Sequence, residues 1–132
     1  MKKEKSYYKS IGEYYERTAN NTTVWEVKRT TTNSLSFSSL MDHQERYLIK
    51  ATERYSYKIS DVGIAKKPFD GTTYIGAYAY VVIVFGSLNV YEIPIHKFIR
   101  EKYTSKRKSL TEERAGQIGE LIILKTPTKG SN

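Results

Sequence analysis

Glu26 and Lys28 stand two residues apart in "TVWEVKRTTT", residues 23–32, inside a run of apolar and β-branched residues. Because residues i and i+2 of a strand share a face, a strand here places the carboxylate and the ammonium side by side. Burying either charge alone is costly, and pairing them, or adding a metal ion and a phosphate, offsets that cost. A carboxylate can hold Mg²⁺, and a nearby lysine can orient a water or stabilise phosphate charge. The pair therefore points to metal-dependent phosphodiester hydrolysis.

The composition fits one domain that spans residues 1–132. The chain has 132 residues, of which 39% are hydrophobic and 27% charged, as is ordinary for a globular protein. No apolar run approaches the roughly 18 residues of a membrane span, and no apolar signal core follows the basic start "MKKEKSYYKS". We therefore expect a cytoplasmic protein without a membrane segment, with loose ends at about residues 1–5 and 126–132.

The charge balance favours a polyanionic partner. The net charge is +8 and the isoelectric point is near 9.5, with 12 tyrosines available for stacking or phosphate contacts. Nucleic acid is the simplest such partner, although the charge alone could serve solubility. Cysteine is absent, which excludes disulfides and thiolate zinc sites, and two histidines are too few for a histidine-rich metal site.

The hydrophobic periodicity predicts an α/β domain with a central mixed sheet flanked by helices. "AYAYVVIVF" is a near-continuous apolar run, typical of a central strand covered on both faces, and Pro94 suggests that the next strand lies at an edge. A capping box of Ser109 with Glu112 predicts the start of the last helix. The segment 56–76 is predicted to be irregular. Helices are predicted at 6–20, 40–55 and 109–121, a short helix or a turn at 96–104, and strands at 22–30, 77–85 and 90–95.

The stretch "WEVKRTTTNSLSFSSLMDHQERYLIKA", residues 25–51, resembles the PD-(D/E)XK nuclease superfamily, particularly the RecU- and Hjc-type Holliday-junction resolvases and related phage proteins. In these proteins an E-x-K strand precedes a Thr/Ser-bearing stretch and a helix that opens with His-Gln. This chain shows Glu26, Lys28, Thr30, His43 and Gln44 in that order, and the resemblance covers about residues 10–100. It implies a restriction-endonuclease-like core of αβββαβ type, Mg²⁺ dependence, with Mn²⁺ as a substitute, and a DNA substrate.

The chain departs from the family pattern in its second carboxylate. The family has an Asp on a strand just before the E-x-K strand, and here no Asp precedes Asp42. The best substitute is Asp70 in "KKPFDGTTY", where a turn could return a carboxylate to the Glu26 face and bring Lys66 and Lys67 near phosphate. Equally, Asp70 could simply support a turn before a glycine.

Each of the other candidate residues could have a functional role or a purely structural one. Glu13 or Glu16 matches a metal-binding Glu that the family often carries on its first helix, but both suit solvated helix positions. His43 is a nucleic-acid contact or a plain first-turn residue. Gln44 either anchors its helix to the E-x-K strand, as part of the catalytic group, or touches a phosphate. The tyrosines of the first helix favour a core or a dimer interface over a stacking platform.

The remaining candidates are cationic or polar residues that suit phosphate contact. The loop "KYTSKRKS", residues 102–109, is either a solvated charge run or a phosphate contact before a helix. The full set of expected nucleic-acid contacts is Arg29, Thr30, His43, Lys66, Lys67, Lys106, Arg107 and Lys108.

Three functions follow as hypotheses. The first is an Mg²⁺-dependent DNA endonuclease, plausibly a four-way-junction resolvase of phage or prophage origin that acts as a homodimer on branched or double-stranded DNA in a bacterial host. Its metal ligands would be Glu26 and Asp70, with Glu13 or Glu16, and Lys28 would assist the water. The second, motivated by the absent upstream Asp, is an inactive nucleic-acid-binding protein on a decayed nuclease fold. The third is a phage interaction protein.

Overall fold

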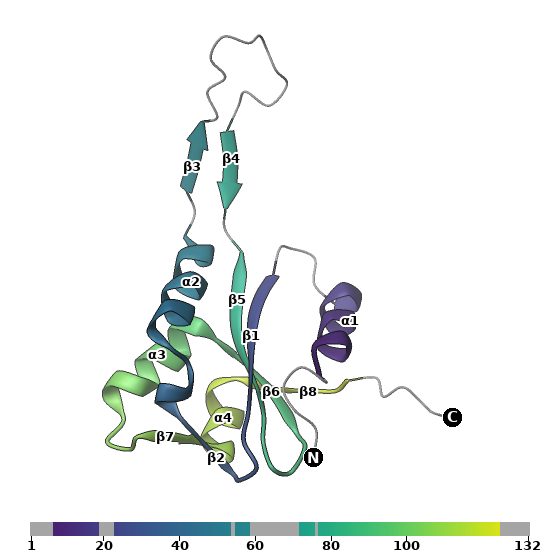
Figure 1. Ribbon diagram of the computed structural model, residues 1–132, viewed down its shortest axis with the longest axis vertical. Coiled ribbons are helices and arrows are strands. Elements are labelled where there is room, and N and C mark those ends of the chain that lie inside the picture. The colour runs from purple at the N-terminus through teal and green to yellow at the C-terminus, as the bar shows by residue number, and fades with distance from the viewer. Residues whose placement is uncertain (1–6, 19–22, 54, 59–71, 76, 125–132) are drawn as a thin grey trace.

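The computed structural model describes residues 7–18, 23–53, 55–58, 72–75 and 77–124. A four-stranded mixed sheet in the order β1–β5–β6–β8 forms its centre (Figure 1). β1 (Thr23–Arg29) pairs in parallel with β5 (Tyr78–Val84), whereas β6 (Val90–Pro94) pairs antiparallel with both β5 and β8 (Glu120–Ile122). The predicted α/β architecture with a mixed central sheet is thereby confirmed.

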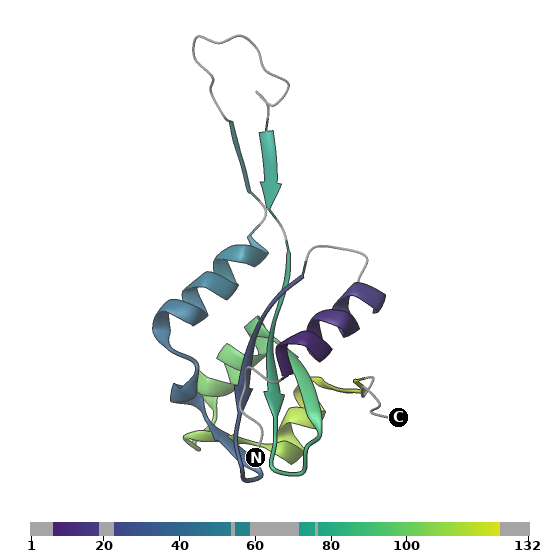
Figure 2. The same cartoon turned by 45° about the vertical axis from the view of Figure 1, so that its right-hand side comes forward.

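Helices cover both faces of the sheet, as Figure 2 shows. On one face lies α1 (Tyr8–Thr18), whose Ile11 and Tyr15 pack against residues of all four strands. The other face carries α2 (Asp42–Thr52), α3 (Ile95–Thr104) and α4 (Glu112–Ile118), packed in a second core around Leu48, Phe98 and Ala115. No helix in the described part of the chain is long and apolar enough to cross a membrane.

The central strand β5 follows directly from its sequence. Residues 81–85 are fully buried, and alternate side chains enter the two cores: Val81 and Ile83 face α2, and Val82 and Val84 face α1. Burial on both faces is what a near-continuous apolar run requires of a strand that lies between two helical layers.

Three smaller elements complete the described structure. A short ladder joins β2 (Ser34–Ser36) to β7 (Ser109–Thr111), and a turn of 3-10 helix occupies Phe37–Ser39. A hairpin of β3 (Tyr55–Lys58) and β4 (Thr72–Ile75) projects beyond the sheet in Figure 1. The prediction that 56–76 is irregular was therefore wrong for these two strands, because their pairing with each other is not visible in a short polar pattern.

Two local predictions are corrected. β6 is an interior strand, not an edge, and Pro94 is tolerated because only residues 90–92 of β6 pair with β8. The last helix begins at Glu112, and its cap is Thr111, whose hydroxyl accepts a hydrogen bond from the Arg114 N–H at 3.2 Å; Ser109 lies in β7.

The order of elements agrees with the αβββαβ pattern only in part. β5 pairs in parallel with β1, and α2 lies between them in the chain, but so do the short strands β2, β3 and β4. However, only residues 19–22 separate α1 from β1, which is too short for two further strands. The E-x-K strand is the first strand of this sheet, where the resemblance implies the third.

We predict that Glu92→Gln stabilises the fold at neutral pH. Glu92 accepts a hydrogen bond from the Tyr15 hydroxyl at 2.7 Å and lies directly opposite Glu120 on β8. Burial raises the pKa of Glu92 above its usual value, the Tyr15 hydrogen bond opposes this, and the Glu120 charge adds to it. Because its pKa is raised, Glu92 contributes to stability at low pH, where it is protonated, and this contribution is lost as Glu92 ionises with rising pH. Glutamine keeps the acceptor and removes the charge.

The expected gain in unfolding free energy at pH 7 is below about 1 kcal/mol. It should shrink towards pH 4, where the wild-type Glu92 is protonated. Urea unfolding of both proteins at the two pH values measures it. A Glu92→Gln protein less stable than wild type at pH 7 would show that the ionised form makes a favourable contact.

Candidate functional site

Glu26 and Lys28 lie on the face of β1 that α2 covers. The alternation along β1 sends Trp25 and Val27 into the α1-side core, while Val24 packs in the core beneath α2. Glu26 and Lys28 share the face of Val24. The sequence-based expectation that the two charges point together is met.

The two charged groups are close, and most of each side chain is covered by its neighbours. Lys28 Nζ lies 3.8 Å from Glu26 Oε2, and their side chains are 11% and 28% exposed. At 3.8 Å the contact is an ion pair without a hydrogen bond. Lys28 makes no hydrogen bond to any other residue in the described ranges, so the three donors of its ammonium are left for water or for a ligand.

Gln44 connects α2 to this pair. Its side-chain oxygen accepts a hydrogen bond from the Met41 N–H at 3.0 Å, where it caps the start of α2. Because that contact uses the amide oxygen, the amide nitrogen faces the strand, and it donates to Glu26 Oε2 at 3.0 Å. Gln44 thus anchors its helix to the E-x-K strand, one of the two roles predicted for it.

The oxygens of Glu26 are used unequally. Both Gln44 and Lys28 approach Oε2, whereas Oε1 has no partner among the residues that the structure describes. Glu26 therefore retains a carboxylate oxygen able to ligate a cation or to accept a hydrogen bond from a water.

A second ion pair holds α2 beside α3. Lys102 Nζ lies 3.2 Å from Glu45 Oε2, and Glu45 is only 9% exposed. Burial by itself lowers the pKa of Lys102, but the hydrogen bond and charge of Glu45 outweigh it, and the pKa is raised. At the other end of the helices Thr52 Oγ1 lies 3.1 Å from His96 Nε2, so α2 and α3 run antiparallel. Because Glu45 directly follows Gln44, the ion pair of Glu45 with Lys102 holds the helical turn that carries Gln44.

Three expected nucleic-acid contacts lie near the pair but not in it. Arg29 is on the opposite face of β1, and its partly buried side chain has an Nε atom with no hydrogen-bond partner. Thr30 forms a turn in which its hydroxyl lies 3.1 Å from that of Thr32. His43 is exposed on the first turn of α2, on the outer side of the helix.

The predicted metal ligands are not assembled within the described residues. Glu13 and Glu16 are exposed on α1, which covers the opposite face of the sheet from Glu26. Among the residues with described positions, no three acidic or histidine side chains gather closely enough to hold a metal ion. Asp70, Lys66 and Lys67 fall within residues 59–71, outside the described residues.

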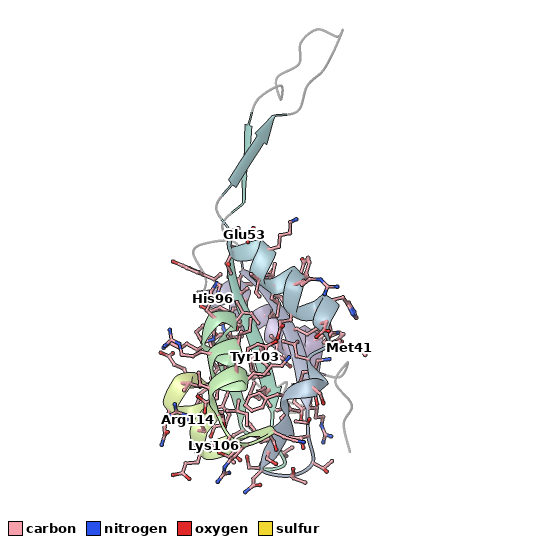
Figure 3. All side chains as sticks on the ribbon, turned by 90° about the vertical axis from the view of Figure 1, so that its left-hand side faces the viewer. Met41, Glu53, His96, Tyr103, Lys106 and Arg114 are labelled. Carbon is pink, nitrogen blue, oxygen red and sulfur yellow. The ribbon has the colours of Figure 1, made fainter. Side chains whose placement is uncertain are left out.

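The outer surface of α2 and α3 carries exposed cations that sequence reasoning missed. Figure 3 views this surface, with Met41 and Glu53 marking α2, and His96 and Tyr103 marking α3. Lys106, Arg107 and Lys108 extend it through the exposed loop before β7. None of the following exposed cations forms an ion pair with a described residue: Arg46, Lys50, Lys97, Arg100, Lys106, Arg107 and Lys108. Helical spacing on α2 and α3 was the signal that could have revealed the first four.

Opposing charges on this surface are few. Glu45 and Glu101 are paired with Lys102 and Arg114, which leaves Asp42 on α2 and Glu53 directly after it as exposed acids. Because α2 and α3 cover the face of the sheet that carries Glu26 and Lys28, the cationic surface lies on the same side as this pair.

Comparison of the chain with protein-family models, with curated proteins and with solved structures gave no match.

Proposed function

We propose that this protein is an Mg²⁺-dependent DNA endonuclease whose reaction centre is formed by Glu26, Lys28 and Gln44. The observation that carries the proposal is the state of Lys28: its side chain is only 11% exposed, while its ammonium makes no hydrogen bond to a described residue and stands 3.8 Å from a carboxylate. An ammonium with so few partners is stabilised by an incoming anion. A phosphodiester is an anion that suits the net charge of +8.

Each side chain has a distinct task in this proposal. Lys28 attracts the scissile phosphate and stabilises the negative charge that develops on it. Glu26 uses its unoccupied Oε1 towards the cation or the attacking water, while Gln44 holds Oε2 and so fixes the rotamer of the carboxylate. The preorganisation rests on packed elements, because β1 and α2 contact each other directly.

The donor set agrees in kind with Mg²⁺. Protein sites for this ion use one or two carboxylates and complete the shell with water and substrate phosphate. Glu26 is one such carboxylate, and Asp70 remains our proposal for a second. A divalent cation bound there would supply an activated water and stabilise charge on the leaving oxygen.

The cationic surface of α2, α3 and residues 106–108 supports DNA as the polyanion. Its seven cations, named above, lack ion-pair partners in the described structure and can each displace a condensed counterion from DNA. We include branched DNA, such as a four-way junction, and action as a homodimer in the proposal.

Cleavage of a four-way junction and of a linear duplex tests the proposal. We expect the wild type to cut in Mg²⁺ and not in EDTA, and we expect Lys28→Gln to reduce the rate by about 10-fold or more, because it removes a charge beside the reacting phosphate. Lys9→Gln on α1 removes an exposed lysine on the opposite side of the sheet and serves as the matched control. Its rate should stay within about twofold of wild type.

Binding without cleavage is the second candidate function. The observation that favours it is that the described cluster holds a single carboxylate, Glu26. In that case the protein binds DNA with an affinity that falls steeply with salt, and Mg²⁺ produces no cleavage. If the protein neither cuts nor binds DNA at moderate salt, both functions are refuted and an interaction protein becomes the better explanation.

A further inference from the structure

A pocket of about 310 Å³ opens beside β1, on the strand that carries the candidate reaction centre. It is lined by Tyr8, Trp25, Glu26 and Val27. This volume is at the lower end for small-molecule sites, and it suits a single heterocycle better than a duplex. Tyr8 belongs to α1 and the other three residues to β1, so the pocket lies between these two elements, which are labelled in Figure 1.

Trp25 is a preorganised aromatic wall of this pocket. Its ring stacks on Tyr15, with centroids 5.0 Å apart and planes inclined by 28°, and Tyr15 stacks in turn on Tyr80 at 5.8 Å. The Tyr15 hydroxyl is tied to Glu92 at 2.7 Å. Since the supporting rings are packed and hydrogen-bonded, Trp25 would not have to rearrange to accept a planar ligand.

Tyr8 supplies a second aromatic side chain that the core does not use. It is the first residue of α1, its side chain is 49% exposed, and it belongs to neither hydrophobic core of the described structure. An exposed tyrosine that lines the same pocket as Trp25 can take part in stacking a base, because every nucleobase has a π face.

We propose that this pocket receives one unpaired nucleobase from the strand whose phosphodiester lies at Glu26 and Lys28. The proposal rests on the proposed function and names its substrate class: nucleic acid with an unpaired or extruded nucleotide at the cut. Trp25 and Glu26 are consecutive residues that point to opposite faces of β1, and β1 lies at the edge of the described sheet, so a nucleotide can reach both faces around this edge. A base and its own phosphate could thus occupy the two sides together, which a base inside an intact duplex stack cannot do.

The test uses Trp25 as its own reporter, because it is the chain's single tryptophan. In EDTA, where Mg²⁺-dependent cleavage does not occur, we expect a short oligothymidylate to quench the Trp25 fluorescence on binding, and a perfect duplex to quench it much less. Tyr8→Ala should weaken the single-strand affinity about 5- to 100-fold and leave the duplex affinity unchanged. Tyr8→Phe, which keeps the ring, should bind like the wild type.

Tyr103→Ala is the matched control, since Tyr103 is an exposed tyrosine on α3, across the sheet from the pocket. It should not change the ratio of single-strand to duplex affinity. Equal effects of Tyr8→Ala on both ligands, or no effect on either, would overturn the base pocket while leaving the nuclease proposal standing. Absence of binding to both DNAs by the wild type would overturn both proposals.

Discussion

Glu26→Gln is expected to lower the rate of Mg²⁺-dependent DNA cleavage by at least about 100-fold without unfolding the protein. Glutamine has the same shape and keeps an oxygen that can accept the hydrogen bond from Gln44 Nε2. It lacks the negative charge that pairs with Lys28 at 3.8 Å and that would ligate the cation. The loss of activity should therefore exceed any loss of stability that comes from leaving Lys28 without its ion-pair partner.

Three measurements separate these effects. Single-turnover cleavage reports the chemical step, urea unfolding reports stability, and duplex binding in EDTA reports affinity, which should stay the same or rise because a negative charge near the DNA is lost. Glu113→Gln, an exposed substitution on α4 with the same charge change, is the control and should cut like the wild type. Full activity in Glu26→Gln would place the chemistry elsewhere in the chain.

The E-x-K strand and the helix after it were predictable because each depends on local pattern. Strand alternation alone placed Glu26 and Lys28 on one face, and the apolar run 77–85 could only be a strand covered on both sides. The contact of Gln44 with Glu26 was among the predicted alternatives. The hydrogen bond by which the Gln44 side-chain oxygen caps the start of α2 was not predicted. Which amide atom meets the carboxylate is decided by the Met41 N–H, one turn earlier.

Non-local features were not predictable in the same way. The periodicity of α1 marks its apolar side, but it does not say which face of the sheet the helix covers, and this choice separates Glu13 and Glu16 from Glu26. Likewise β8 has only three residues, and its pairing with β6 turned the expected edge strand into an interior one. Both outcomes are set by tertiary packing, which a single sequence window does not contain.

The placement of Gln44 depends on a second layer of charges beneath α2. Glu45 follows Gln44 in the first turns of the helix, and its carboxylate is almost removed from solvent. Lys102 on α3 is its ion-pair partner, and their proximity joins the two helices at the end nearest the E-x-K strand. Support of this kind ties the geometry of the site to the packing of α2 on α3.

Lys102→Met is accordingly expected to lower the free energy of unfolding by about 2 to 3 kcal/mol. Removing one partner leaves the Glu45 carboxylate unpaired in a poorly hydrated place, and such losses reach about 3 to 5 kcal/mol for fully buried pairs. The side chains of Lys102 and Glu45 are 20% and 12% exposed, which moderates the loss. Because the pKa of Lys102 is raised above its usual value of about 10.5, the contribution of the lysine charge to stability is complete at neutral pH and is lost as the pH rises through the raised pKa.

A double variant and a matched single variant make this prediction specific. Lys97→Met removes an exposed cation from the same helix and should change stability by less than about 0.5 kcal/mol. Glu45→Met combined with Lys102→Met replaces the pair by apolar groups of similar size, and it should recover most of the lost stability. Cleavage by Lys102→Met should fall and cleavage by the double variant should recover, because Gln44 keeps its contact with Glu26 only while the first turns of α2 stay in place. A Lys102→Met protein as stable as Lys97→Met would mean that water, and not Lys102, solvates Glu45.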